Sequence, residues 1–439
     1  MRNNFLLKLL LLLCIGFSAS NIYSQTTGWE QIRRQYATNA LYITNDGTLL
    51  ISDFLFNGNG GIYISEDSGK TWEKTDAPDY TYNIFVENED YIFAAGGESR
   101  IARSADGGKT WETMSYARAL EGTAAENEKD YTQCYAMTIH NGDLYIADFT
   151  GGGVMYSEDN GETWNQTDIE SLKYGEFDAK LGDRPTENLY NLVSYNGDLY
   201  TFGVYFVFKM DNETKSWEAL RSDSNFMAIS AIYHDKMCCG RSIMNETTEV
   251  PFIVTLDENG EWGEIPRPEG FIDNNIRAMH ADEDALYVGC GTRGILYTPD
   301  EGATWFDISE GLPWYGSEDN KTYDVPMNIK TDKKYIYLAI YREHLDDFGH
   351  VSGVYRLSKR DLPQSSVEKI EIKKSAVTKV GTTLRIAPEA STFALYDLNG
   401  SQMNIDMTGL SADIASLPQG VYIYKVEING ETQTGKIIR

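Results

Sequence analysis

Four arginines occupy the same place in a repeated pattern of predicted strands, just after the second strand of a repeat: Arg100, Arg241, Arg293 and Arg342. A guanidinium group can bind a carboxylate or a sulfate through two parallel hydrogen bonds. If the four side chains converge, they form a site for an anionic group of a ligand. The alternative is that each arginine pairs with a carboxylate of a neighbouring loop.

Two aspartates, Asp53 and Asp148, fall near the same level of the repeat and are the only candidates for catalysis. Hydrolysis of a glycosidic bond needs two carboxylates, about 5 Å or about 6.5–9.5 Å apart, and the sequence does not give that distance. Aromatic residues of the long loops are candidates for stacking on sugar rings, or else pack the loops: Tyr116, Tyr174, Phe177, Trp314 and Tyr315.

The repeat that positions these residues is clearest in one run, Ser65-Glu66-Asp67-Ser68-Gly69-Lys70-Thr71-Trp72. The run recurs at 104–111, 157–164 and 298–305, with eroded copies at 211–217 and 255–262. A period of this kind must be found before any other structural prediction is made, because it decides the whole fold. The motif tryptophans follow one another at spacings of 39, 53, 53, 45 and 43 residues. Four-stranded propeller blades need about 40–50 residues each.

Each copy of the run follows a predicted hairpin and a third strand. In the third repeat, two β-patterned runs at 135–139 and 144–147 flank Asn141-Gly142, which is a strong signal for a two-residue hairpin turn. A third run at 153–156 leads into the motif, and the motif tryptophan opens a fourth strand. The sequence therefore predicts four short antiparallel strands in every repeat.

A last repeat at 325–357 keeps three strands but lacks the motif and its tryptophan-led strand. The segment Gly28-Trp29-Glu30-Gln31-Ile32 resembles the outer strands and has no blade before it, so we expect it to complete the last blade. This pairing would close the ring and remove an exposed sheet edge. The predicted fold is all-β, a seven-bladed β-propeller followed by a small β-sandwich-like C-terminal domain.

The chemistry of the motif is structural. Its aspartate can accept hydrogen bonds from its own turn, its glycine takes the left-handed conformation, and its tryptophan packs against the neighbouring sheet. The structural residues of the four clear copies are Asp67, Trp72, Asp106, Trp111, Asp159, Trp164, Asp300 and Trp305.

The motif resembles the Asp-box, or BNR, repeat, S-x-D-x-G-x-T-W, and the resemblance covers residues 28 to 358. It implies a propeller of the superfamily that includes sialidases, sortilin-like receptors and photosystem assembly factors. It does not imply one function, because these proteins share the fold and differ in their sites. A sialidase would show a Phe/Tyr-Arg-Ile-Pro segment ahead of its boxes, and this chain has none.

The order of strands in a blade separates two kinds of loop. The first and third turns, which include the Asp boxes, are short and lie on one face. The other connections lie on the opposite face and include long loops at 113–132, 168–187, 308–323 and 341–353. Because binding residues concentrate in long loops on a rigid scaffold, we expect the functional face opposite the Asp boxes.

The end of the chain changes in composition. After a polar linker at 359–383, a short β unit contains Tyr396-Asp397-Leu398-Asn399-Gly400, then Leu417-Pro418-Gln419-Gly420-Val421-Tyr422, and a basic last strand. These landmarks resemble the C-terminal sorting domain of type IX secretion substrates, which implies the type IX machinery as a partner and passage across an outer membrane. Where that family often has Tyr-Pro-Asn-Pro, this chain has Ala387-Pro388-Glu389-Ala390.

The beginning of the chain predicts export as well. Residues 1–24 have a basic start, an apolar run too short to span a membrane and a small polar end, as signal peptides do. The predicted domains are therefore a signal peptide at 1–24, the propeller at 25–358, the linker at 359–383 and the sorting domain at 384–439. The expected location is secreted or at the outer-membrane surface, with no membrane span.

Composition excludes some partners. With 66 acidic and 38 basic residues the net charge is −28, which would repel nucleic acid. Cys134, Cys238, Cys239 and Cys290 have no zinc-site spacing and are interpreted as packing residues, and no metal or cofactor is predicted. We expect a secreted or cell-surface binding module, for a glycan or a protein, on the long-loop face. The alternative is a glycoside hydrolase, sialidase-like or polysaccharide-cleaving.

Overall fold

The hairpin at the start of each repeat forms as its sequence predicts. In the third repeat of the computed structural model, β10 (Cys134–His140) pairs antiparallel with β11 (Asp143–Asp148) across Asn141-Gly142. The φ angles of these two turn residues are 51° and 94°, the positive values that a type I′ turn requires. β12 (Gly153–Ser157) and β13 (Asn165–Gln166) then complete a sheet in the order β10-β11-β12-β13.

The structure describes residues 28–35, 38–53, 60–121, 126, 133–149, 153–172, 189–203, 206–222, 229–240, 242–246, 251–269, 271, 273–317, 320–341, 352–363, 377–380, 383–386, 390–397, 400–418, 420–428 and 431–439. The predictions for Arg241, Tyr174, Phe177, Arg342 and the signal peptide concern residues outside these ranges. Two compact units result, Met1–Pro363 and Gln364–Arg439.

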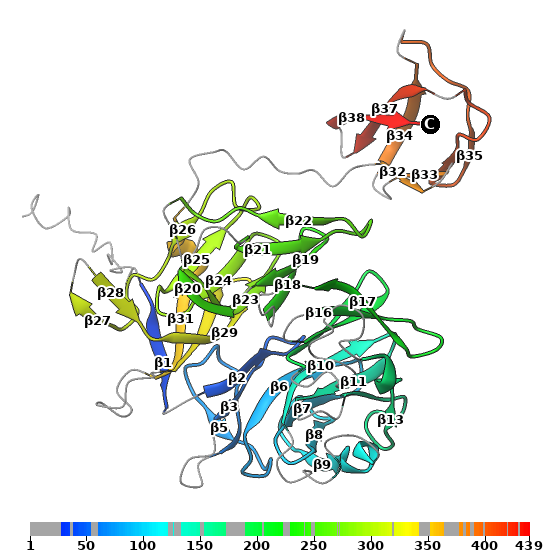
Figure 1. Cartoon of the computed structure of the whole chain (residues 1–439). Coiled ribbons are helices and arrows are strands. Elements are labelled where there is room, and N and C mark those ends of the chain that lie inside the picture. The colour runs from blue at the N-terminus through cyan, green and yellow to red at the C-terminus, as the bar shows by residue number, and fades with distance from the viewer. Residues whose placement is uncertain are drawn as a thin grey trace, which may run out of the picture. The chain divides into compact units, whose positions relative to one another are not determined.

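The four-stranded sheet of the third repeat recurs through the first unit (Figure 1). The sheet before it is β6 (Tyr82–Glu87), β7 (Ile92–Gly96), β8 (Arg100–Ser104) and β9 (Glu112–Ser115), and the one before that is β2 (Thr38–Ile43), β3 (Leu49–Asp53), β4 (Gly61–Ser65) and β5 (Glu73–Lys74). After it come β14 (Asn191–Tyr195), β15 (Asp198–Phe202), β16 (Phe206–Met210) and β17 (Trp217–Ser222), then β18 (Ile229–Tyr233), β19 (Lys236–Gly240), β21 (Ile253–Leu256) and β22 (Trp262–Ile265). The next sheet is β23 (Asp273–Ala281), β24 (Leu286–Cys290), β25 (Ile295–Thr298) and β26 (Phe306–Asp307), extended at its inner edge by β20 (Ser242–Glu246).

The last sheet of the ring contains the first strand of the chain. Its order is β29 (Val325–Thr331), β30 (Tyr335–Tyr341), β31 (Gly353–Ser358) and β1 (Glu30–Arg34), with β1 antiparallel to β31. The prediction that the segment around Trp29 supplies the missing outer strand is therefore confirmed. The inner strands β2 and β29 also contact each other, so the ring of inner strands is closed.

The hydrophobic core lies between neighbouring blades. One cluster joins Leu41 and Leu49 of the first blade to Tyr337 and Val354 of the last, and Trp72 packs against it. The other motif tryptophans belong to or pack against similar clusters, as their predicted role requires: Trp111, Trp164 and Trp305. Because each apolar blade face is covered by the next blade, the ring buries them all only when it is closed.

The connections carry little regular structure. Short 3-10 helices are η1 (Ala117–Leu120), η3 (Ile169–Ser171) and η5 (Lys359–Asp361). The predicted irregular loop at 308–323 instead contains a hairpin, β27 (Trp314–Ser317) and β28 (Asn320–Tyr323). No described helix is long and apolar enough to cross a membrane.

The second unit forms two small sheets. One has the order β32 (Val377–Val380), β33 (Thr383–Ile386), β36 (Ser411–Asp413) and β35 (Asp406–Thr408), and the other has β34 (Ala390–Tyr396), β37 (Val421–Ile428) and β38 (Glu431–Ile438). Apolar residues from both sheets share one core, which includes Leu384, Leu395 and Val426, each fully buried.

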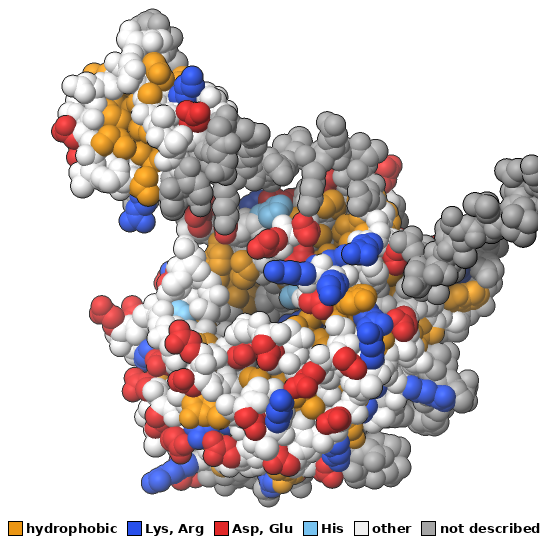
Figure 2. All heavy atoms as spheres, turned by 180° about the vertical axis from the view of Figure 1, so that it is seen from behind, with side chains coloured by type: hydrophobic (Ala, Val, Ile, Leu, Met, Phe, Trp, Pro, Cys, Tyr) orange, Lys and Arg blue, Asp and Glu red, His pale blue; other side chains and the backbone are white. Residues whose placement is uncertain are grey.

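On the face seen in Figure 2, acidic and basic side chains are intermixed over the surface of the first unit. The acidic excess on this face is therefore spread out and does not form one acidic patch, as expected of a solvated surface.

Candidate ligand-binding site

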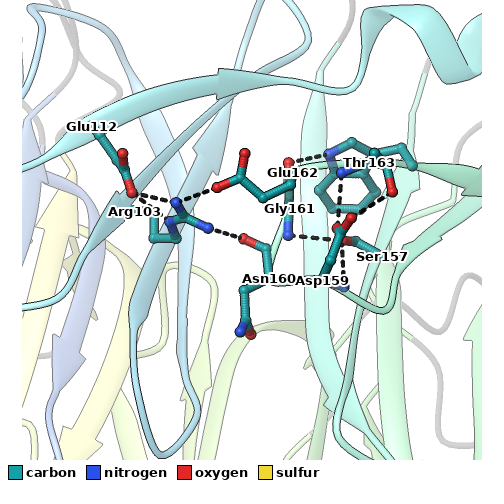
Figure 3. A network of polar contacts seen from close by, with 9 residues as sticks. Arg103, Glu112, Ser157, Asp159, Asn160, Gly161, Glu162 and Thr163 are labelled. Atoms are coloured by element: carbon teal, nitrogen blue, oxygen red, sulfur yellow. Dashed lines mark hydrogen bonds and ion pairs between the residues drawn. The ribbon is translucent and has the colours of Figure 1, made fainter.

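The aspartates of the repeated motif hold their own turns. The Asp159 carboxylate accepts hydrogen bonds from the Thr163 N–H at 2.8 Å, the Thr163 hydroxyl at 2.6 Å and the Ser157 hydroxyl at 2.8 Å (Figure 3). Burial alone would raise the pKa of Asp159, but these hydrogen bonds hold it below its usual value. The carboxylates of Asp67, Asp106 and Asp300 are held in the same way. Each accepts a hydrogen bond from the hydroxyl of the Ser or Thr at the first position of the motif and another from the N–H of the Thr at the seventh position. We call these four segments, 65–72, 104–111, 157–164 and 298–305, the Asp turns.

An arginine ties one Asp turn to the blade before it. Arg103, on β8, donates to Glu112 at 2.6 Å, to the carbonyl oxygen of Asn160 at 2.8 Å and to Glu162 at 2.7 Å (Figure 3). Its guanidinium also lies 4.6 Å from the ring centroid of Tyr91. The Asp turn at 157–164 is therefore fastened to the second blade.

Other polar contacts join neighbouring blades on the same face. Lys109 pairs with Glu66 at 2.9 Å, and Lys236 pairs with Glu301 at 2.5 Å. A ring nitrogen of His140 lies 2.8 Å from the Asn212 side-chain oxygen. These charged and polar groups thus help to hold neighbouring blades together.

On that opposite face, the inner strands of five blades begin with a β-bulge, in which one extra residue interrupts the pairing register. A bulge redirects a side chain and is frequent next to functional sites. The bulge residues are Asn39, Asn83, Tyr135, Arg277 and Met327, and all five line the central channel.

The central channel has a volume of about 730 Å³ and is lined by residues of the inner strands. Much of its wall is apolar and partly exposed, with Ile84, Val86, Ile139, Ile229 and Met327. Volumes of roughly 300–1,000 Å³ with apolar walls and a few polar groups are typical of ligand sites. The channel therefore has the size and the kind of lining that a ligand site needs.

Asparagine side chains tie the inner strands together at the bulge level, which we call the channel mouth. The Asn328 amide donates to the Asn39 carbonyl oxygen at 3.1 Å, and the Asn39 amide donates to the Tyr82 carbonyl oxygen at 3.3 Å. The Asn83 amide continues the series to the Cys134 carbonyl oxygen at 3.0 Å. These bonds satisfy backbone acceptors at the free inner edges of the sheets, so that the mouth is preorganised.

An aromatic group stands at the mouth beside the third and fourth blades. Phe149 contacts Tyr135 and Tyr190 edge to face, with ring centroids 5.2 Å and 4.9 Å apart. Tyr135 is 42% exposed and lines the channel together with Tyr190. A rigid aromatic surface that is partly exposed next to a cavity can pack against a ligand at little entropic cost.

The two aspartates proposed for catalysis are both completely buried at the end of a second strand. Asp53 pairs with Arg33 at 2.5 Å, and its pKa is raised by burial, against the opposing effect of Arg33. Asp148 accepts a hydrogen bond from the Tyr116 hydroxyl at 3.1 Å. Tyr116 is itself fully buried, so the expectation that it stacks on a ligand is wrong: its ring packs against Trp164.

Of the four predicted arginines, Arg100 and Arg293 lie within the described residues. Arg100 pairs with Glu98 at 3.1 Å and stacks 4.2 Å from the ring centroid of Tyr80, as in the loop-pairing alternative. Arg293 is exposed. Trp314 is 37% exposed, and the Lys321 amine lies 4.8 Å from its ring centroid, while for Tyr315 only the backbone is described.

Sequence reasoning missed the residues of the channel. Tyr135 and Met327 stood in predicted inner strands, but alternation alone does not tell which strand residues border the axis. A usable signal was the polar residue at the start of these strands, Asn39, Asn83 or Arg277, because a polar side chain there is out of place in a core strand.

Metal and thiol chemistry find no support in the described residues. They contain no group of three or more His, Cys, Asp or Glu residues that could hold a metal ion. Cys134, Cys238, Cys239 and Cys290 are buried and form no disulfide with one another, and burial raises the pKa of Cys134 and Cys238. Protonated, buried thiols act as packing residues, as the sequence predicts.

No protein-family model matches the chain, and no curated protein matches it. Solved structures do. A structure titled "YCF48 bound to D1 peptide" is 14% identical, with a TM-score of 0.52 over 76% of this chain and 97% of that one. YCF48 from Cyanidioschyzon merolae is 14% identical, with a TM-score of 0.50 over 75% and 98%. The extracellular domain of a hybrid two-component system from B. thetaiotaomicron is 12% identical, with a TM-score of 0.51 over 94% of this chain and 47% of that one. Together with the repeated sheets, these matches identify the fold as a β-propeller.

Proposed function

We propose that the protein is a binding module that holds an extended polypeptide segment at the channel mouth, on the face opposite the Asp turns. The observation that carries the proposal is the channel, about 730 Å³ in volume and bordered by the five bulge residues. It combines apolar walls with a few oriented polar groups, which is the usual make-up of a ligand site.

The lining favours a polypeptide over a glycan. Ile84, Ile139 and Ile229 would meet apolar side chains favourably, whereas they would strip water from sugar hydroxyls without replacing the hydrogen bonds. The side chains of Asn191 and Ser230, which bond to each other at 2.7 Å, offer polar groups for a peptide backbone. One of the similar propellers was solved with a peptide bound, which supports this choice of ligand.

A glycan ligand is the second candidate, and the aromatic group around Tyr135 favours it. Sugar rings stack on exposed aromatic faces, and Tyr135 is the exposed member of that group. The same group suits a proline or an aromatic side chain of a peptide, so it does not separate the two ligands by itself.

Hydrolysis is the weaker alternative. A glycosidase must bring both carboxylates to the scissile bond. Asp53 and Asp148 are completely buried and held by Arg33 and Tyr116, so neither can reach a substrate without breaking these contacts. We therefore retain hydrolysis only as an outcome of the assay below.

Export completes the proposed function. The predicted signal peptide at 1–24 and the predicted type IX sorting domain at 384–439 would deliver the propeller to the outer-membrane surface or the medium. Deletion of residues 384–439 should leave the protein inside a host with a type IX system. Equal surface and medium levels of the full and shortened chains would contradict this part of the proposal.

Selection of peptides tests the binding function. A display library of random nine-residue peptides is selected on the protein, and selected peptides are measured by isothermal titration calorimetry. Tyr135→Ala should weaken binding at least fivefold, while Lys70→Ala, an exposed change in an Asp turn, should not alter it. Glycan arrays and hydrolysis assays on sialosides and plant polysaccharides run in parallel. Binding of glycans only, turnover of any substrate, or equal affinity of the Tyr135 variant would overturn the proposal.

A further inference from the structure

Two cations line the central channel, Lys330 on β29 and Arg277 on the neighbouring strand β23. Arg277 is a bulge residue of the mouth, and Lys330 lies farther along its strand, away from the mouth. The sole carboxylate among the described lining residues is Glu87, which accepts a hydrogen bond from the backbone N–H of Asn45 at 2.8 Å. In a protein of net charge −28, the channel lining thus carries an excess of positive charge.

Neither cation has a protein partner within the described residues: no ion pair and no hydrogen bond of either side chain is found there. This sets them apart from other cations of the same unit whose side chains are 8–15% exposed. Each of those pairs with a carboxylate at 2.5–2.7 Å: Arg33, Arg103, Arg356 and Lys359.

An unpaired, partly buried cation is unfavourable for the folded protein. Burial lowers the pKa of Lys330, and no acidic group opposes this effect. The neighbouring His280 does not share the charge, because burial and the positive charge of Lys330 lower its pKa to about 3 and keep it neutral. Residues that lower the stability of the fold and make no compensating contact are expected at functional sites.

We propose that Lys330 and Arg277 bind a carboxylate of the polypeptide that occupies the channel. The inference rests on the proposed function and adds to it the chemical group that the ligand carries into the channel. That group can be an Asp or Glu side chain or the C-terminal carboxylate of the segment, and the chemistry of recognition is the same. A ligand carboxylate would supply the missing partner through charge-assisted hydrogen bonds, which are stronger than hydrogen bonds between neutral groups.

The test uses the tightest peptide from the display selection, synthesised in three forms. One form keeps every carboxylate, the second replaces each Asp or Glu by its amide, and the third has an amidated C-terminus. We expect one of the two neutralised forms to bind at least tenfold more weakly, and that form identifies the source of the carboxylate. Equal affinity of all three forms overturns the inference while the proposed function stands.

Variants locate the site. With the carboxylate peptide, Lys330→Met and Arg277→Gln should each raise the dissociation constant at least tenfold, and Lys330→Arg should restore most of the affinity. With the neutralised peptide, Lys330→Met should change affinity less than twofold. Lys70→Met, the same exchange on the exposed Asp turn, is the matched control and should have no effect. Losses that are equal for both peptides would show that the carboxylate binds elsewhere and would overturn the inference.

Two further outcomes distinguish failure of this inference from failure of the proposed function. If no peptide is selected and a uronate-ended trisaccharide binds in a Lys330-dependent manner, the polypeptide is the wrong ligand class and both proposals fail as stated. If the protein binds neither a peptide nor that trisaccharide, the channel is not a ligand site. Both of these outcomes are measured with the unmodified protein, before any variant is made.

Discussion

Replacement of Arg356 by methionine should show how much one side chain contributes to closing the ring. Arg356 lies on β31 and is 9% exposed, and it reaches from the last blade to the first. One guanidinium nitrogen donates to the Ser68 carbonyl oxygen at 2.6 Å, and another pairs with Glu30 of the closing strand at 2.5 Å. Its guanidinium also lies 4.6 Å from the ring centroid of Tyr335.

The expected loss follows from these contacts. A hydrogen bond from a charged donor to a partly buried carbonyl contributes about 2 kcal/mol, and the stacking on tyrosine adds about 0.5–1 kcal/mol. The ion pair adds only about 0.5 kcal/mol, because the Glu30 side chain is 63% exposed and solvent screens the charges. The free energy of unfolding should therefore fall by about 3 kcal/mol, which moves the urea midpoint by about 1 M.

Arg103 provides the matched comparison, because it makes the corresponding contacts, and one further ion pair to the exposed Glu162, between the second and third blades, which are adjacent in the chain. Arg103→Met should lower the free energy of unfolding by a similar amount, within about 1 kcal/mol. Urea unfolding followed by tryptophan fluorescence measures both variants. A loss below about 1 kcal/mol for Arg356→Met, beside a full loss for Arg103→Met, would refute the view that this side chain holds the ring closed.

The other predictions concern the channel and the Asp turns. Lys330→Met should raise the free energy of unfolding by about 1 kcal/mol, because it removes a charge that burial disfavours. Lys70→Met is the control and should leave the free energy unchanged in the same urea experiment. A loss of stability in Lys330→Met would contradict the prediction. Tyr135→Ala should cost less than about 1 kcal/mol of stability while weakening peptide binding, since its ring is 42% exposed, and a large drop in thermal midpoint would assign it to the core instead. Hydrogen bonds from the Thr71 N–H and hydroxyl lower the pKa of Asp67 to about 2, so its charged form stabilises the fold above the unfolded pKa of about 4, and this contribution disappears as the pH falls through about 2. The difference in urea midpoint between the wild type and Asp67→Asn should thus be constant above pH 5 and shrink to a small fraction near pH 2, whereas a difference that is undiminished at pH 2 would show that the carboxylate charge is not its source.

The repeating framework could be predicted because its contacts are local in sequence. Asp67 bonds to Thr71, four residues away, and Asn141-Gly142 encodes its turn without help from the rest of the fold. The closing strand was predictable for a related reason: the residues around Trp29 share the pattern of the outer strands and have no blade of their own.

The partners of the buried aspartates could not be predicted. Repeat alignment correctly placed Asp53 and Asp148 at one level, the last residue of a second strand. It did not show that Asp53 meets Arg33 of the closing strand, or that Asp148 meets Tyr116 of a connecting loop. Both partners come from outside the repeat unit, where no periodic signal guides the prediction.

The channel was missed for a different reason. A bulge adds one residue to one strand, and only the pairing register reveals which residue is extra. Asn39, Tyr135 and Arg277 therefore looked like ordinary members of an inner strand, although each is turned into the channel. The repeat pattern drew attention to the arginines after the second strands, and of these the described ones, Arg100 and Arg293, are not among the residues that line the channel.

The division between the two faces explains why the channel is the place for selective binding. Asp turns recur in nearly the same form because each has the same structural role, which is to help join one blade to the next. The bulge position, by contrast, keeps its geometry while the side chain changes from Asn39 to Tyr135, Arg277 and Met327. Such a position can present different chemistry from each direction around a single ligand. Specificity then depends on the residues that depart from the repeat, and Arg277 and Lys330 are channel residues whose charge has no partner within the described part of the chain.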